Sequence, residues 1–124
     1  MKRYLLFLLM SLPLLLVAQD AIRISAHALG AAYGADYDAA RRKYSGHVVI
    51  VSGIVKDIDH EKSGQVYASI FLEGGPDTPD IHCRIEDAEA ASRLRGLAKG
   101  DRVTVSGTVI GKLLNVILQE CTVQ

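Results

Sequence analysis

Two stretches of this 124-residue chain share a pattern of apolar residues interrupted by a glycine. Residues 49–55 read VIVSGIV and residues 103–109 read VTVSGTV, and each stretch follows a turn-forming glycine. β-Branched residues favour strands, and a glycine inside such a strand marks a bend, a bulge or a close backbone approach. The pattern predicts two strongly curved strands at the seam of a small β-barrel. The structural glycines of the two copies are Gly46, Gly53, Gly100 and Gly107.

The first of these strands, predicted over residues 47–58, is apolar on both faces before Gly53. A strand with two apolar faces needs two covers. The barrel interior supplies one cover, and a helix that precedes the strand is the candidate for the other.

That helix is predicted from the alanine-rich, proline-free stretch that precedes Ser45. Ser25 is a suitable N-cap, and Gly30 and Gly34 either weaken the helix or allow a neighbour to approach closely. One apolar stripe follows helical spacing and is expected to pack on the first strand. It consists of Leu29, Tyr33, Tyr37, Ala40 and Tyr44.

Residues 65–73 alternate between apolar and polar positions and predict a second strand. A loop rich in glycine and proline follows, and a third strand with Ile81, Cys83 and Ile85 facing inward comes next. The outward side chains of the two strands form a candidate binding face for a nucleotide or a sugar, although the helix is an alternative cover for them. These side chains are Tyr67, Phe71, His82 and Arg84.

A short helical segment is predicted over residues 86–97, and a fourth strand begins near Arg102. Its inward residues are Val103, Val105, Gly107 and Val109. The fifth strand is predicted over residues 113–123 with imperfect alternation, because Leu114, Val116 and Leu118 oppose Ile117, Cys121 and Val123. A bulge near Gln119 or Glu120 reconciles the two sets.

Three strands, a short helix and two strands within about 80 residues is the order of an OB-fold, a five-stranded Greek-key barrel. In that topology the first strand pairs with the fourth, which brings the two glycine-containing stretches together. The third strand neighbours the fifth, which brings Cys83 and Cys121 onto adjacent strands. The predicted fold class is therefore mainly β, with an N-terminal helix added to an OB-fold barrel.

The N-terminus has the features of a secretory signal peptide, because a basic start precedes an apolar run that ends at Val17 and Ala18. The run is short for a membrane span, and we expect cleavage after Ala18. The expected division is a signal peptide (1–18), a helix packed on the barrel (19–45) and the barrel itself (46–124). The expected location is periplasmic or secreted.

Export places Cys83 and Cys121 in an oxidising compartment, where a disulfide is the default. On the chain-entropy model, closing a loop of 38 residues (121 minus 83) stabilises a fold by roughly 4 kcal/mol. The alternative is a reactive thiol, which requires a lowered pKa.

Removal of the leader takes two of the 14 basic residues and none of the 14 acidic ones, which leaves 12 basic residues and a slightly acidic chain. Proteins that bind nucleic acid usually carry a basic surplus. We therefore do not expect nucleic acid as the partner, and we expect a monomer without a membrane span after cleavage.

The sequence shows no motif of the common enzyme classes. His60 and the neighbouring carboxylates Asp57, Asp59 and Glu61 lack the second histidine of a zinc-protease helix and are interpreted as a solvated loop. Ser52 and Ser106 lie inside strands, without the turn that exposes a catalytic serine. We therefore expect no enzyme activity, no cofactor and no metal site.

The chain resembles the tRNA_anti-like family of exported bacterial OB-fold proteins. The residues that carry this resemblance extend from the leader and the alanine-rich helix to the late cysteine. They include Tyr44, Ser45, Gly46, Gly53, Cys83, the turn of Lys99, Gly100 and Asp101, Val103, Val105, Gly107 and Cys121. Such proteins commonly have an asparagine in the helix, where this chain has Gly34, Ala35 and Asp36. The family is named for its similarity to anticodon-binding barrels, and a shared fold does not specify an activity.

The expected function is an exported, non-enzymatic binding or structural module of the bacterial envelope, with a protein, a glycan or a small molecule as partner. The alternative is a binder of single-stranded nucleic acid or oligosaccharide that uses the outer face of the second and third strands. Stacking on Tyr67 and Phe71 would supply about 1 to 3 kcal/mol per base.

Overall fold

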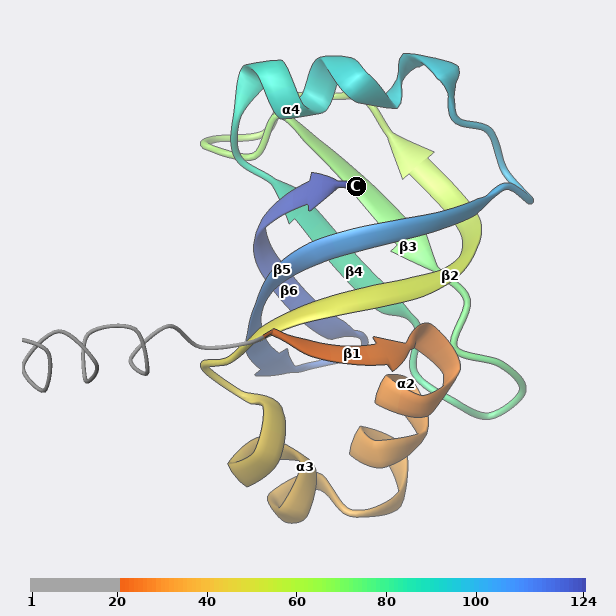
Figure 1. Cartoon of the computed structure of the whole chain (residues 1–124), viewed down its shortest axis with the longest axis vertical. Helices are drawn as coiled ribbons and strands as arrows, with labels where there is room; N and C mark the ends of the chain where they lie inside the picture. The colour runs from red at the N-terminus through yellow and green to blue at the C-terminus, as the bar shows by residue number, and fades with distance from the viewer. Residues whose placement is uncertain (1–20) are drawn as a thin grey trace, which may run out of the picture.

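The computed structural model describes residues 21–124 (Figure 1). The predicted signal peptide, residues 1–18, lies outside the described residues. None of the helices within residues 21–124 has the length and apolar character that a membrane-crossing helix needs.

Five strands close into a barrel (Figure 1). β2 pairs with β3, β3 with β4, β4 with β6, β6 with β5, and β5 returns to β2. Only the β4–β6 pairing within the barrel is parallel. This order, with a helix between the third and fourth strands, confirms the predicted OB-fold. The strands are β2 (Val48–Asp59), β3 (Ala68–Leu72), β4 (Ile81–Ile85), β5 (Arg102–Lys112) and β6 (Val116–Val123).

The two glycine-containing stretches lie side by side at the β2–β5 seam, as predicted. Gly53 is opposite Val103, and Gly107 is opposite Val49. At both glycines the backbone approaches a neighbour closely. A Cβ added at Gly53 would lie 2.7 Å from Ala26 Cβ, and one at Gly107 would lie 2.6 Å from Cys121 Sγ. The glycine of the shared pattern therefore allows a helix to pack closely against β2 at Gly53, and it allows the Cys121 side chain to pack closely against β5 at Gly107.

The prediction of one continuous N-terminal helix is wrong. The segment contains a short strand, β1 (Ile22–Ser25), and two helices, α2 (Ala26–Ala35) and α3 (Tyr37–Tyr44). Ser25 caps α2 as predicted, because its Oγ accepts a hydrogen bond from the Ala28 N–H at 3.0 Å. The break falls at Asp36, which has an extended backbone and accepts the Ala39 N–H at 3.1 Å as the N-cap of α3.

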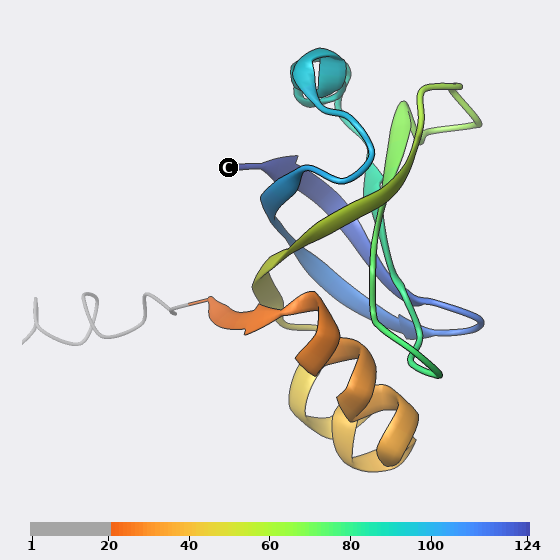
Figure 2. The same ribbon diagram turned by 90° about the vertical axis from the view of Figure 1, so that its right-hand side faces the viewer.

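The two helices cover one end of the barrel and not the outer face of β2 (Figures 1 and 2). Val48 on that face is therefore 49% exposed. The prediction that the N-terminal helix covers the outer face of this strand is wrong. The apolar stripe packs inward at every position except Tyr37, which is 44% exposed. Tyr33 is buried, and its hydroxyl lies 2.7 Å from Ser45 Oγ.

The opposite end of the barrel is covered by α4 (Ala88–Ser92) and the 3₁₀ helix η1 (Arg93–Gly96), with Leu94 buried beneath (Figure 1). The predicted bulge in the last strand is confirmed, because the β5–β6 register shifts opposite Gly107 and Glu120 has a φ of 52°. The last strand begins later than expected. Leu114, predicted to belong to this strand, lies in the β5–β6 turn and is 84% exposed.

Candidate ligand-binding face

The outer surface of β3 and β4 is the candidate face. The antiparallel register places Phe71 opposite His82 and Ser69 opposite Arg84. Alternation along each strand directs these four side chains away from the barrel interior. Because α2 and α3 lie at the end of the barrel, the helices leave this face uncovered (Figure 2).

Phe71 and His82 form a stacked pair on this face. Their ring centroids are 4.4 Å apart and their planes differ by 20°. His82 Nε2 lies 2.9 Å from Ser69 Oγ, which fixes the orientation of the imidazole. Burial, followed by the nearby Arg84 guanidinium, lowers the pKa of His82 below its usual value. The pair therefore presents an uncharged aromatic surface at neutral pH.

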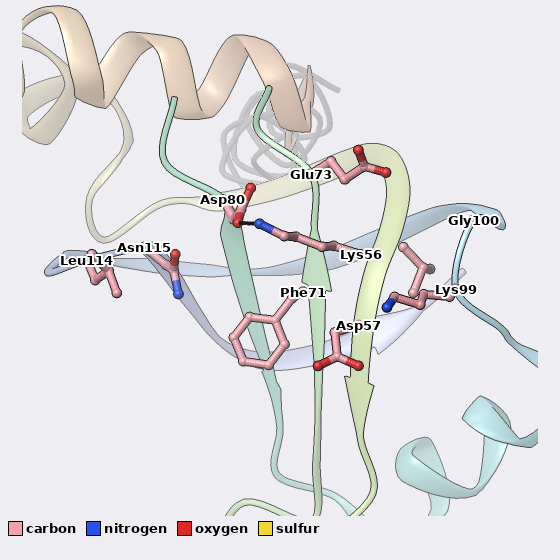
Figure 3. Close-up of a pocket in the computed structure, with 10 residues that line it drawn as sticks. Lys56, Asp57, Phe71, Glu73, Asp80, Lys99, Gly100, Leu114 and Asn115 are labelled. Carbon is pink, nitrogen blue, oxygen red and sulfur yellow. Dashed lines mark hydrogen bonds and ion pairs between the residues drawn. The ribbon is translucent and has the colours of Figure 1, made fainter. Parts of the chain in front are cut away.

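A hollow of about 670 Å³ adjoins Phe71 (Figure 3). Its wall is formed by β2, by β3 with the loop that follows it, and by the loop that precedes β5. The β5–β6 turn contributes Leu114 and Asn115. Charged side chains around it come from several elements. They are Lys56, Asp57, Glu73, Asp80 and Lys99.

An ion pair crosses one side of the hollow. Lys56 Nζ extends from β2 over β3 to Asp80 Oδ2 at 2.6 Å (Figure 3). Asp80 Oδ1 also accepts the Gly74 N–H at 2.9 Å. Burial of Asp80 opposes its ionisation, but the hydrogen bonds from Lys56 and Gly74 outweigh this effect and lower the pKa of its carboxyl group. The hydrogen bond to Asp80 raises the pKa of Lys56.

Of the four side chains predicted to form a binding face, Phe71 alone lines the hollow. Phe71 and His82 lie together, and Arg84 occupies the next row of the sheet beside Ser69. Tyr67 precedes β3 and lies outside the hollow, with Lys62 Nζ 5.1 Å from its ring centroid.

The other lining residues were missed by the sequence analysis. Alternation beyond Gly53 would place Asp57 on the same face as buried Val55, and the register shift between Val55 and Asp57, which no local pattern predicts, leaves its carboxylate exposed. Residues 21–124 contain no cluster of three or more histidine, cysteine or acidic side chains placed to hold a metal ion.

Cys83 and Cys121 are buried, unbridged thiols in this structure, and they contact each other. The hydrogen bond with Cys121 and then burial raise the pKa of Cys83 well above its usual value. A raised pKa disfavours the thiolate and hence the reactive-thiol alternative. The disulfide stays a prediction.

Comparison with protein families gives a match to the tRNA_anti-like model over residues 4–123. The chain belongs to the tRNA_anti-like family. A search of curated proteins gives no match. Among solved structures, this family member is similar to an Entamoeba histolytica asparaginyl-tRNA synthetase in complex with asparaginyl-adenylate, with a TM-score of 0.58 and 16% identity. It is also similar to a Leishmania major Friedlin protein assigned as an aspartyl-tRNA synthetase, with a TM-score of 0.53 and 15% identity.

Both alignments cover 86% of this chain but only 24% and 21% of the respective synthetase chains. At these identities the likeness shows the fold alone. The tRNA_anti-like chain thus shares an OB-fold with a part of each synthetase, and its own side chains carry the argument about its ligand.

Proposed function

We propose that this tRNA_anti-like protein is a non-enzymatic binding module whose ligand lies across the outer face of β3 and β4. The stacked Phe71–His82 pair beside the hollow is the observation that carries this proposal. Small-ligand sites typically combine an apolar or aromatic surface with a few placed polar groups. Here the polar groups are the carboxylate of Asp57, the amide of Asn115 and the ammonium of Lys99.

The charges of the hollow favour an oligosaccharide over a phosphate-rich strand. Asp80 already neutralises Lys56. The remaining charges of the hollow are the two carboxylates of Asp57 and Glu73 and the single ammonium group of Lys99. A sugar presents hydroxyl groups that hydrogen-bond to carboxylates and amides and a ring that packs on Phe71, and OB-folds are known to bind oligosaccharides. A phosphate group would be repelled by the two carboxylates.

Single-stranded nucleic acid is the second candidate, and the synthetase neighbours favour it. This indication runs against the expectation, drawn from net charge, that nucleic acid is not the partner. The partly exposed Phe71–His82 pair also suits base stacking.

Replacing Phe71 with alanine is expected to weaken ligand binding by about 5- to 160-fold, because the stacking surface is worth about 1 to 3 kcal/mol. A glycan array and a panel of labelled single-stranded oligonucleotides, each at low and high salt, would identify the ligand. Titration of the wild type and of the Phe71→Ala variant with that ligand then gives the change in affinity. Tyr37→Ala is the matched control, because it removes an exposed aromatic ring on α3.

Equal affinities for Phe71→Ala and the wild type would contradict the proposed face. Binding to oligonucleotides that weakens with salt, together with no glycan binding, would select the second candidate.

We further propose that the protein is exported to the envelope or the medium, on the sequence of residues 1–18. When the full chain is expressed in a bacterium, the periplasmic or secreted fraction is expected to contain a protein that begins at Gln19. Intact-mass measurement and N-terminal sequencing would identify that end. Recovery of only the uncleaved chain in the cytoplasm would contradict export.

A further inference from the structure

A second hollow, of about 480 Å³, is lined by residues of β1, β5 and the end of β6. It lies on the opposite side of the barrel from β3 and β4, as the positions of β1 and the C-terminus in Figure 2 indicate. Arg23 from β1 and Arg102 from β5 both line it and are both exposed. Thr104 and Gln124 contribute its polar groups.

The strand register explains how two arginines far apart in the sequence come to one hollow. Arg23 is opposite Ile50 of β2, and Arg102 is opposite Ile54 of the same strand. The two arginine positions are therefore four residues, or roughly 13 Å, apart along β2. Ser52 lies between these two levels, and its Oγ is 3.0 Å from Thr104 Oγ1. The two arginine positions thus flank a pair of hydroxyl groups.

The charges of this hollow differ from those of the hollow beside Phe71. None of its lining residues within the described chain has an acidic side chain, and the backbone carboxylate of Gln124 forms no ion pair with either arginine. Within residues 21–124, neither Arg23 nor Arg102 takes part in an ion pair. The Phe71 hollow instead has three carboxylates and a lysine that is already paired. The guanidinium groups at the seam therefore remain available to an anion.

We propose that Arg23 and Arg102 form a binding site for a phosphate group at the β1–β2–β5 seam. A guanidinium group donates two parallel hydrogen bonds to phosphate oxygens, and it keeps its charge at any physiological pH. The hydroxyl pair of Ser52 and Thr104 lies between the levels of the two arginines. The side-chain amide of Gln124 also lines the hollow, and it keeps one N–H besides the one that it donates to Ser106 Oγ at 3.2 Å. This site is independent of the ligand that binds beside Phe71.

The site is tested by NMR titration of the isotopically labelled protein, purified from cells that express the full chain. Pyrophosphate is the probe, at low ionic strength, and chloride at matched ionic strength is the reference. The backbone amides of Val103, Thr104 and Gln124 are expected to shift in a saturable manner with pyrophosphate and not with chloride. The double variant Arg23→Gln/Arg102→Gln is expected to bind pyrophosphate at least about 10-fold more weakly.

Arg93→Gln is the matched control, because it removes an arginine of η1 outside this hollow and is expected to leave the affinity unchanged. Unchanged affinity in the folded double variant would overturn the proposal, as would saturable shifts confined to the face around Phe71 and His82. The spectrum of each variant without ligand shows whether the variant is folded. If the double variant is unfolded, the affinities of the single variants Arg23→Gln and Arg102→Gln for pyrophosphate are compared with that of the wild type instead.

A phosphate group can belong to a soluble ester or to a lipid headgroup. Titration with glycerol 3-phosphate measures binding to a soluble phosphate ester. Co-sedimentation with phosphatidylglycerol vesicles, compared with vesicles of phosphatidylcholine alone, measures binding to a lipid headgroup. In either case the double variant is expected to lose the binding, and retention of binding to both sources would contradict the assignment to Arg23 and Arg102.

Discussion

Oxidation of Cys83 and Cys121 to a disulfide is expected to raise the melting temperature of the barrel by about 10 °C or more. The two buried thiols contact each other between the neighbouring strands β4 and β6. A bridge would close a loop of 38 residues (121 minus 83). Such a bridge typically contributes about 2 to 4 kcal/mol, and each kcal/mol raises the melting temperature of a domain of this size by about 4 to 8 °C.

Calorimetry of the protein before and after treatment with dithiothreitol measures this difference, and a thiol-reagent count on the folded protein checks the redox state. The double variant Cys83→Ala/Cys121→Ala is the control and should melt at the same temperature with and without reductant. Two reactive thiols in protein isolated from the envelope under non-reducing conditions would contradict the predicted disulfide.

Replacing Gly30 with alanine is expected to lower the free energy of unfolding by about 2 kcal/mol or more, although alanine is the better helix former. Gly30 of α2 faces the loop that connects β3 to β4. An added Cβ would lie 2.3 Å from the carbonyl oxygen of Pro79 and 2.9 Å from Thr78 Cγ2. Because the closest atom belongs to the backbone, relief of the clash requires the whole loop to move.

Gly34→Ala is the matched control within the same helix. Its added Cβ would lie 3.3 Å from the side-chain Cδ of Pro79, so it is expected to be neutral or to stabilise the protein by up to about 1 kcal/mol. Urea unfolding of both variants gives the comparison. Equal stabilities of the two variants would show that the approach of α2 to the loop is not tight.

The Gly30 variant should also alter the hollow beside Phe71. The loop that Gly30 contacts ends at Asp80, the partner of Lys56. A displaced loop would therefore weaken this ion pair, and an NMR spectrum of the variant would show shifts at Lys56 and Phe71. The packing of α2 thus positions one side of the candidate face.

The barrel was predictable because its strands carry strong local signals. β-Branched residues and strict alternation define β5, and the failure of alternation in β6 predicted the bulge that the structure shows at Glu120. The N-terminal helical segment was harder to predict from the sequence. Asp36 lies in an alanine-rich run without proline, so composition favoured one continuous helix, while the structure uses its carboxylate as a cap. β1 has only four residues, too few for a clear periodicity.

The candidate face was predictable only where it lies on strands. Alternation identified Phe71 and His82, because each occupies an outward position of a regular strand. Lys56 and Asp80 are 24 residues apart and meet across β3, because β2 pairs with β3 and β3 pairs with β4, and no local pattern predicts this contact. Leu114 was included in the fifth strand because the β5–β6 turn contains two leucines where turns usually have polar residues.

The bridge from Lys56 over β3 to Asp80 also bears on the thermodynamics of recognition. Together with the Ser69–His82 hydrogen bond and the Phe71–His82 stack, it immobilises side chains that would otherwise lose rotamer freedom when a ligand binds. Each side chain ordered in advance saves about 0.5 to 1.5 kcal/mol of the entropic cost of association. A preorganised surface of this kind selects its ligand by shape, and it discriminates against molecules that require the face to rearrange.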